Sequence, residues 1–291
     1  ENGKEVGQIK SFKALATALS SCVGNGNIVG IAAAIAIGGP GAIFWMWVAS
    51  LLGMATKFSE ICLAMHYRIQ DEAGNFRGGV MYILSRGMKN KTLGKILGGA
   101  FAVFTVMVSF ISCGALQANT IANSLNGETG IGIPLWVVAI VVLVLDGLVV
   151  CGGLKKIANV TTVLTPVMAL IYIGFSLIII ILHANMIPTA IYYVVKSAFT
   201  GDAAVGGVAG ATMAFAIQKG VSRGVFSNEA GIGSSAIVHA TAIVDKPTRQ
   251  SLYGIIEVFF DTMVICTVTS LLILTTGVWN SGVTDGTALA S

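Results

Sequence analysis

The chain has 291 residues, of which 55% are hydrophobic and 10% charged, with a mean hydropathy of +0.85 and a formal net charge of +4. An ordinary soluble domain carries about 25% charged residues, so this composition excludes a soluble globular protein and indicates a chain solvated by lipid. The sequence offers no soluble basic face, which excludes a nucleic-acid partner.

Residues 14–56 contain no Asp, Glu, Lys, Arg or His. One bilayer crossing needs about 20 apolar residues, so this stretch predicts two membrane spans that meet at residues 38–41, Gly-Gly-Pro-Gly. The same criterion predicts seven spans along the chain, at residues 14–37, 42–66, 96–122, 134–152, 157–183, 204–243 and 250–278. The connectors are polar, and we expect an interfacial helix around Tyr192 and Tyr193.

The first span is interrupted by a polar, glycine-rich stretch, Gly24-Asn25-Gly26-Asn27. In hydrocarbon, the backbone can leave the helix only where it lines a cavity or binds a ligand. We expect one half-helix to end around Ser21 and Cys22, where its free carbonyls would suit a cation. The next half-helix, starting around Asn27, would offer its amides to a carboxylate.

The residue types at this break allow two interpretations. Gly24 and Gly26 would let the backbone approach a ligand closely, and Asn25 or Asn27 could cap the following turn. Alternatively, the GxxxG spacing of Gly26 and Gly30 could mark a close helix packing contact. The asparagines favour the first interpretation, because they need polar partners inside an apolar run.

The sixth span is interrupted in a similar way over residues 218–231. Lys219 and Arg223 are spaced as on one helical face, but the interleaved glycines argue against a regular helix here. We expect Ser227 or Asn228 to cap a following helix that runs to about residue 243. The alternative is an ordinary loop, although each flanking segment is too short to cross a bilayer alone.

The two breaks lie five spans apart, so the chain runs through them in opposite directions. Corresponding broken helices in two halves of a membrane protein indicate an inverted-repeat secondary transporter with its binding site near the midplane. The spacing therefore predicts a first repeat at residues 14–183 and the start of a second, inverted repeat at residues 204–278. The ligand site is expected between the two breaks.

Two carboxylates in the seventh span are candidates for ion coupling. Glu257 and Asp261 are four residues apart, so they share a helix face. Each charge at a helix centre costs about 2.5–3.5 kcal/mol on insertion scales, so each is expected to have a partner or a function. They could serve a cation or pair with Lys219 or Arg223, and the sequence favours neither option.

Other polar residues in the spans also have two interpretations. Lys57 and Glu60 are three residues apart and favour a structural ion pair. Asp146 could belong to a proton or ion route, or make a buried contact to the fifth span. Gln117 and Asn119 could reach a bound ligand or join helices by hydrogen bonds. The five cysteines have irregular spacing, which favours packing residues over a disulfide framework or a zinc site.

The basic residues predict the orientation, because those in short loops stay cytoplasmic. With the amino end inside, Lys196 is the one basic connector residue that lies outside. The basic connector residues inside are then Lys4, Lys10, Lys13, Arg68, Arg77, Arg86, Lys89, Lys91, Lys95, Lys155, Lys156, Lys246 and Arg249. We expect a multi-pass protein of a bacterial or archaeal cytoplasmic membrane with a cytoplasmic amino end.

Four stretches closely resemble the alanine or glycine:cation symporter family, also called sodium:alanine symporters. They are residues 20–30 (SSCVGNGNIVG), 38–48 (GGPGAIFWMWV), 53–60 (GMATKFSE) and 224–234 (GVFSNEAGIGS). The resemblance covers nearly the whole chain. It implies a leucine-transporter-like fold, ten core helices in two inverted halves plus an additional helix, and cotransport of sodium with alanine or glycine.

The resemblance also implies roles for individual residues. Carried onto this chain, Gly24, Asn25, Gly26 and Asn27 would hold the amino-acid carboxylate or the ion. The pocket would be completed by Phe226, Ser227, Asn228 and Gly231. Asn25 stands where many relatives have Thr. The leading helix and the last three core helices are expected to be missing, so a sodium site shared with the eighth core helix would be incomplete.

Together, these patterns predict an all-α polytopic membrane protein, in which residues 1–291 form a single, incomplete transporter domain with about seven of ten core helices. We expect sodium-coupled symport of alanine or glycine by alternating access, with no enzyme activity and no cofactor besides the transported Na⁺. The Na⁺ is expected near Cys22 and Asn27. Further ion-coupling candidates are Ser21, Glu257 and Asp261, and Gln117 is a further substrate contact.

Three other classes remain as alternatives. The first is a proton-coupled amino-acid carrier that uses Asp146, Glu257 or Asp261. The second is an intramembrane serine hydrolase with Ser234 and His239, but five residues on a helix place these side chains about 140° apart. The third is a channel or a purely structural membrane protein, which saturable uptake would exclude.

Overall fold

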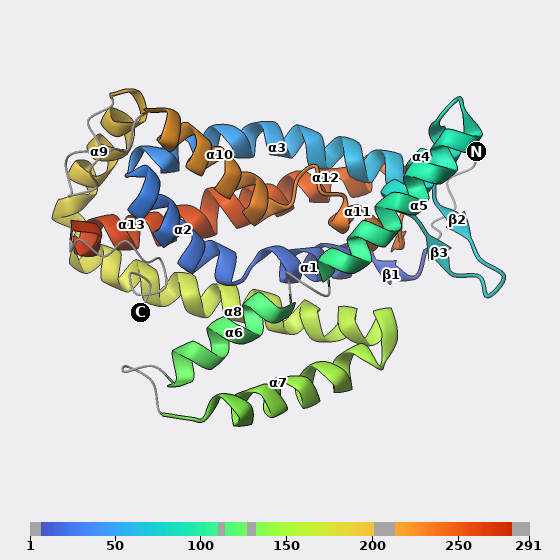
Figure 1. Cartoon of the computed structure of the whole chain (residues 1–291), viewed down its shortest axis with the longest axis horizontal. Coiled ribbons are helices and arrows are strands. Elements are labelled where there is room, and N and C mark those ends of the chain that lie inside the picture. Colours follow the sequence, from blue (N-terminus) through green and yellow to red (C-terminus); the bar gives the residue numbers. More distant parts are fainter. Residues whose placement is uncertain (1–6, 110–113, 127–131, 201–212, 281–291) are drawn as a thin grey trace. The chain divides into compact units, whose positions relative to one another are not determined.

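The computed structural model describes residues 7–109, 114–126, 132–200 and 213–280, and these residues are mainly helical (Figure 1). This agrees with the predicted all-α class. The α-helices are α1 (Ser11–Cys22), α2 (Asn25–Gly38), α3 (Gly41–His66), α4 (Val80–Gly87), α5 (Lys91–Val108), α6 (Gly114–Asn126), α7 (Leu135–Val150), α8 (Gly153–Leu182), α9 (Ile187–Phe199), α10 (Met213–Asn228), α11 (Ser234–His239), α12 (Pro247–Val258) and α13 (Thr267–Thr276).

Shorter elements complete the described chain. Between α12 and α13, residues Phe259–Cys266 form a π-helix, η3, and two 3₁₀ turns lie at Ala184–Met186 (η2) and Val278–Asn280 (η4). The strands form two pairs, β1 (Ile9–Lys10) with β4 (Ala242–Ile243) in parallel and β2 (Ile69–Gln70) with β3 (Phe76–Arg77) antiparallel. The polar connector after α3 therefore contains a hairpin and α4.

The chain forms two compact units, each built from segments that are far apart in the sequence. Unit 1 comprises residues 1–18, 58–164 and 232–253, and unit 2 comprises residues 19–57, 165–231 and 254–291. This division does not follow the predicted repeats, whose relation to one another stays a prediction.

Four described helices are long and apolar enough to cross a membrane, and the bent pair α1–α2 raises this number to five. α7 is apolar but shorter. The predicted third and sixth spans fall partly on residues 110–113 and 201–212, which lie outside the described ranges. The count of seven spans therefore stays a prediction, while the multi-pass character agrees with these apolar helices.

The predicted first break is confirmed. α1 ends at Cys22, α2 begins at Asn25, and the chain bends by 42° between the two helices. Asn27 stabilises the start of α2 from inside the helix, because its Oδ1 accepts a hydrogen bond of 2.8 Å from the backbone N–H of Gly24. This satisfies one of the amides that a helix start leaves without a partner.

The second break is shorter than predicted. The expectation of an unwound segment from Gln218 onward is wrong, since α10 continues as far as Asn228 and the break covers only residues 229–233. Ser227 and Asn228 therefore end one helix and do not cap the next. The cap of α11 is Gly233, and α11 ends at His239, before the predicted residue 243.

The glycines of α10 serve helix packing, which explains why they do not unwind it. A Cβ added at Gly220 would clash with the carbonyl oxygen of Ala42, and one added at Gly224 would lie 3.2 Å from the Cβ of Ala49. Gly220 and Gly224 are one turn apart, the small-xxx-small spacing that lets membrane helices approach closely. Backbone proximity between α3 and α10 thus accounts for these residues.

Unit 2 has a continuous apolar core. Buried side chains of α2 (Ile31, Ile35), α3 (Ile43, Met46) and α9 (Val194) pack together with α13. α2 is central, because it also packs against α10 and η3 (Figure 1). The broken start of α2 is therefore held against the carboxyl-terminal end of α10 and the π-helix.

Unit 1 joins its distant segments at the strand pairs. Arg68 donates hydrogen bonds of 3.0 Å to the carbonyl oxygens of Ala240 and Ala242, and its guanidinium lies 4.4 Å from the ring centroid of Phe76. α4 and α5 approach closely at Gly94 and Gly98 of α5. An added Cβ at Gly94 would clash with the carbonyl oxygen of Leu84, and one at Gly98 would lie 2.7 Å from that of Met81. These contacts hold the connector between α3 and α5 against the segment around β4 within unit 1.

Candidate functional site

Unit 2 brings the start of α2, the last residues of α10 and the π-helix η3 together around one buried carboxylate, Asp261. Its Oδ1 accepts a hydrogen bond of 2.7 Å from Asn27 Nδ2. Its Oδ2 accepts hydrogen bonds of 2.6 Å from Ser227 Oγ and 3.0 Å from Thr262 Oγ1. Cys266 Sγ lies 3.3 Å from both Asn27 Nδ2 and Ser227 Oγ. We call these five residues the Asp261 cluster.

The π-helix explains how both Asp261 and Cys266 reach this cluster. In an α-helix, two residues five apart point about 140° away from each other. A π-helix closes its turns between residues i and i+5, so η3 turns both side chains toward Asn27. π-helical segments occur often at functional sites, and this one contains the carboxylate.

Within the described ranges, Asp261 forms no salt bridge, and its hydrogen-bonding partners there are neutral. Asp261 and Thr262 are fully buried, Asn27 is 1% exposed and Ser227 2%. An ionised carboxylate in such a place is costly unless it is paired or strongly hydrogen-bonded. The Asp261 carboxyl therefore depends on neutral hydroxyl and amide donors for its stabilisation.

A second buried group, the Lys57 cluster, consists of Cys22, Lys57, Asn228 and Glu257. Lys57 Nζ lies 3.1 Å from Glu257 Oε1 and donates a hydrogen bond of 2.8 Å to the carbonyl oxygen of Asn228. Cys22 Sγ donates to the same carboxylate oxygen at 3.4 Å. Since Asn228 is the last residue of α10, Lys57 satisfies a carbonyl at the helix end and balances its partial negative charge.

Asn228 connects the two clusters. Its backbone oxygen accepts from Lys57, and its side-chain Nδ2 donates a hydrogen bond of 3.1 Å to Thr262 Oγ1. Lys57 and Glu257 carry opposite charges that offset each other, whereas Asp261 adds a further negative charge. Within the described ranges, the polar region around Asn228 thus contains a second carboxylate, Asp261, that has no salt bridge.

Arg223 lies at the first break. Its Nη2 donates a hydrogen bond of 2.9 Å to the carbonyl oxygen of Gly26, and its guanidinium carbon lies 5.0 Å from the ring centroid of Phe226. A Cβ added at Gly30 would overlap this guanidinium. Gly30 therefore leaves the space that Arg223 occupies, which gives this glycine a packing role.

The other predicted site residues occupy different positions. Ser21 is exposed at the end of α1, and Gly24, Asn25 and Gly26 are partly buried at the break. Phe226 is 47% exposed, and Gly231 has a φ of 90°, a conformation that glycine adopts easily. Gln117 belongs to unit 1, where it is exposed on α6.

Charged candidates in the spans have partners that the sequence did not predict. Glu257 pairs with Lys57, not with Lys219 or Arg223, and Lys57 makes its salt bridge to Glu257. Asp146 is exposed on α7, so the alternative of a buried contact is wrong for the described chain. Of the four cysteines within the described ranges, Cys22 and Cys266 contact polar atoms and so do more than fill space.

Sequence reasoning missed Thr262 and Cys266, as well as the pairing of Lys57. One signal was available for Lys57, because a charge in a span needs an opposite charge at similar depth, and Glu257 was a candidate. Cys266 gave no comparable signal, because its contact with Asn27 depends on the π-helix.

Ser234 and His239, the residues of the hydrolase alternative, lie at the two ends of α11. His239 is fully buried, and its Nδ1 lies 2.7 Å from Gln250 Nε2. The imidazole is thus held by α12.

Comparison with known proteins identifies relatives of the whole chain. A model of the sodium:alanine symporter family matches residues 1–291. An uncharacterised transporter of Haemophilus influenzae is 46% identical over 276 residues, which cover 94% of this chain and 59% of the relative. The sodium/alanine symporter AgcS of Methanococcus maripaludis is 42% identical, with coverage of 93% and 58%.

A third relative carries a different substrate name. The probable sodium/glutamine symporter GlnT of Bacillus subtilis is 38% identical, with coverage of 97% of this chain and 56% of the relative. The chain therefore spans little more than half the length of these relatives. The named relatives are transporters and not enzymes, so the comparisons give no support to the hydrolase alternative.

Proposed function

The chain belongs to the sodium:alanine symporter family, and we propose that it forms part of a sodium-coupled symporter for alanine or glycine that works by alternating access. The observation that carries this proposal is Asp261, a buried carboxylate bonded by neutral donors beside a broken membrane helix. A buried carboxylate of this kind supports a cation site, and its hydrogen bond to Asn27 ties that site to the partly buried start of α2.

The proposed cation site is the Asp261 cluster. Sodium is a hard cation that prefers oxygen ligands, as calcium and magnesium do. The Asp261 carboxylate and the hydroxyl oxygens of Ser227 and Thr262 are such ligands, and they lie within hydrogen-bond distance of one another. Asn27 would orient the carboxylate, and the bound Na⁺ would balance its charge.

The proposed substrate site is the start of α2. Backbone amides at a helix start attract a carboxylate, and Gly24, Asn25 and Gly26 provide backbone without large side chains near this end. Arg223, bound to the carbonyl oxygen of Gly26, adds a positive charge on the same side. This small, glycine-lined site suits alanine or glycine better than a larger amino acid.

The remaining residues have supporting roles in this proposal. Phe226, Ser227, Asn228 and Gly231 would close the pocket from the end of α10 and the break after it. Carbonyls near Ser21 and Cys22 would help bind the ion, while Glu257 keeps Lys57 in place. The proposed fold is leucine-transporter-like, with the amino end of this chain cytoplasmic.

Uptake by the complete protein in proteoliposomes tests the proposal. We expect saturable alanine or glycine uptake that needs an inward Na⁺ gradient and stops when choline replaces Na⁺. Glutamine, included as a competitor because of the name of one relative, should compete weakly. Alanine uptake of the same rate with and without Na⁺ would contradict the proposal.

Proton coupling is the second candidate, and the geometry of Asp261 supports it. The bond of 2.6 Å from Ser227 Oγ to Asp261 Oδ2 could also form with the hydroxyl accepting from a protonated carboxyl. An uptake series in choline buffers at different pH separates the two candidates. Uptake that follows an inward proton gradient without Na⁺ would support proton coupling and overturn the sodium proposal.

A further inference from the structure

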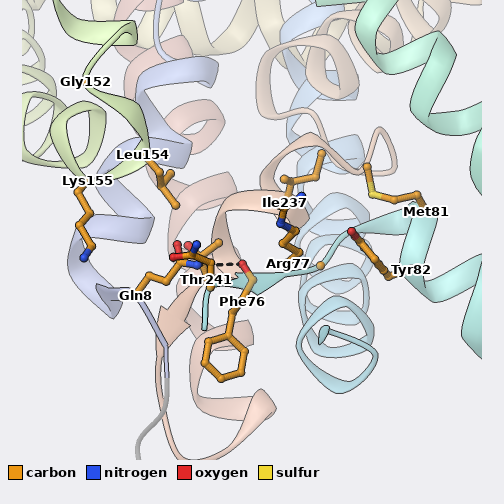
Figure 2. A pocket seen from close by; sticks show the side chains of 12 residues that line it. Gln8, Phe76, Arg77, Met81, Tyr82, Gly152, Leu154, Lys155, Ile237 and Thr241 are labelled. Carbon is orange, nitrogen blue, oxygen red and sulfur yellow. Dashed lines mark hydrogen bonds between the residues drawn. The ribbon is translucent and has the colours of Figure 1, made fainter. Parts of the chain in front are cut away.

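Unit 1 contains a pocket of about 580 Å³ that lies outside the proposed transport site. Figure 2 shows Lys155 and Leu154 on one side of this pocket and Met81 and Tyr82 on the opposite side. Gln8 and Thr241 lie between them, and Gln8 donates to the carbonyl oxygen of Phe76 at 3.3 Å. The pocket is thus built from the hairpin, the start of α4 and the turn between α7 and α8.

The charge of the pocket is positive. Its lining contains Arg77 and Lys155, and no Asp or Glu lines it. Arg77 forms a salt bridge with Asp71, 2.9 Å from Nε to Oδ2, which offsets its charge. A guanidinium has five N–H donors, so others remain for an anion. Within the described part of the chain, Lys155 has no ion pair. The pocket therefore offers cationic donors to an anion.

An apolar groove continues from this pocket along α7. The groove has a volume of about 520 Å³, and its lining includes Leu143, Val144, Leu148 and Lys156. Gly152 lines both the pocket and the groove, so the two cavities share a wall at the end of α7. Asp146, the carboxylate on the same helix, does not line the groove.

This arrangement is that of an amphipathic ligand site. Leu143 is 72% exposed and Leu148 60%, on a helix whose composition is apolar throughout. The basic side chains lie where this helix ends, the level at which lysine and arginine reach the phosphates of a membrane surface. A soluble anion would use the pocket but leave the groove empty.

We propose that the pocket and the groove together bind an anionic phospholipid. Its phosphate lies against Arg77 and Lys155, and its acyl chains lie along Leu143, Val144 and Leu148 up to Lys156. The site is independent of the Asp261 cluster, which belongs to unit 2, so lipid binding and amino-acid transport are measured separately. With the expected orientation, the lipid comes from the cytoplasmic leaflet.

Native mass spectrometry of the complete protein tests this proposal, with phosphatidylglycerol and phosphatidylcholine as probes. The test variant is Lys155→Gln/Lys156→Gln. The matched control is Lys89→Gln/Lys95→Gln, which removes the same charge from exposed positions that line neither cavity. Each basic residue near a membrane surface contributes roughly fivefold to anionic lipid affinity. We expect the phosphatidylglycerol affinity of the test variant to fall by at least that factor, because Lys155 no longer meets the phosphate, and the affinity of the control to stay unchanged.

A second variant addresses the groove without changing any charge. Gly147 lines the groove, and an added Cβ there meets no atom within 4 Å, so Gly147→Phe starts a bulky side chain from an open position in the groove. A photoactivatable phosphatidylglycerol should crosslink to residues 143–156 in the native protein and do so much less in this variant. Three results would each overturn the proposal. The test and control variants could lose phosphatidylglycerol equally, the native protein could retain phosphatidylcholine as well as phosphatidylglycerol, or the crosslinks could fall mainly outside residues 143–156.

Discussion

Asn27 and Asp261 are separated by 234 residues in the sequence and joined by a hydrogen bond of 2.7 Å from Nδ2 to Oδ1. The same Asn27 side chain accepts a hydrogen bond from Gly24 N at 2.8 Å. One amide group thus connects the start of α2 to the carboxylate of η3. A change of charge at Asp261 therefore alters a hydrogen bond of the residue that stabilises the first break.

The first prediction concerns this carboxylate. Asp261→Asn keeps the size of the side chain but removes its charge, so a bound cation loses its main counter-charge. Interactions with a charged group are stronger than those with a neutral one. We therefore expect uptake to fall about tenfold or more. Initial rates of alanine uptake as a function of Na⁺ concentration measure this effect.

Asp146→Asn is the matched control, because it removes the same charge from an exposed position in the apolar helix α7. It should retain the Na⁺ dependence of the native protein. Loss of uptake in Asp146→Asn together with normal uptake in Asp261→Asn would show that the ion site is elsewhere.

The second prediction concerns the buried pair of Lys57 and Glu257. Lys57→Met leaves the carboxylate buried without its counter-charge, which typically destabilises a protein by about 3–5 kcal/mol. The double variant Lys57→Met/Glu257→Gln removes both charges and should recover part of this loss. Thermal unfolding of the purified protein in detergent compares the three forms.

The exposed pair of Arg249 and Asp245, at 2.9 Å, provides the control. Arg249→Met should change the midpoint of thermal unfolding little, because exposed ion pairs contribute little to stability. A double variant at the buried pair that is less stable than Lys57→Met would argue against charge compensation as the role of this pair.

The third prediction concerns the crossing of α3 and α10. In Gly220→Ala, the new methyl group clashes with the backbone oxygen of Ala42, so a helix must shift. Overpacking of this kind costs about 1–3 kcal/mol, and the unfolding midpoint should fall. Gly174→Ala on α8, where an added Cβ meets nothing within 4 Å, should not lower it. If both variants unfold like the native protein, close helix approach is not the role of Gly220.

The fourth prediction separates the role of Gly30 from that of a general helix glycine. In Gly30→Ala, the methyl group displaces the flexible end of Arg223 and breaks its bond to Gly26 O. We expect the KM for alanine to rise roughly tenfold, since charged hydrogen bonds are worth about 1.5–3 kcal/mol, while the unfolding midpoint changes less than in Gly220→Ala.

Gly99→Ala is the control for Gly30→Ala, because an added Cβ there meets no neighbouring atom. Its KM should equal that of the native protein. A native KM in Gly30→Ala would mean that Arg223 does not support substrate binding, whatever the change in stability.

Much of the helical pattern could be predicted because it rests on local properties. The boundary at residues 38–41 was predicted correctly, since α2 ends at Gly38 and α3 begins at Gly41. The break at Gly24 was placed within two residues. The second break could not be placed, because Gly220 and Gly224 have the same local preference whether they unwind a helix or pack it. Only the contact with Ala42 on α3 distinguishes these outcomes.

The candidate site shows the same division. Asn27, Ser227 and Asp261 were candidates from the sequence, since polar groups in apolar spans need partners. The sequence predicted only that the site lies between the two breaks. It did not predict that Thr262 and Cys266 belong to the Asp261 cluster. The π-helix brings Cys266 toward Asn27. It could not be predicted, because the apolar pattern of this segment does not distinguish a π-helix from an α-helix.

By itself, the sequence determined that this chain is a helical membrane protein, that a helix is broken at Gly24, and which family it resembles. These properties depend on how each residue and its near neighbours interact with lipid or with the adjoining backbone. The tertiary structure decided that Lys57 pairs with Glu257 and that Asp261 meets Asn27 and Ser227. Which partners meet depends on distances across the folded unit. A polar side chain in an apolar span indicates that a partner is needed, but the sequence does not identify that partner.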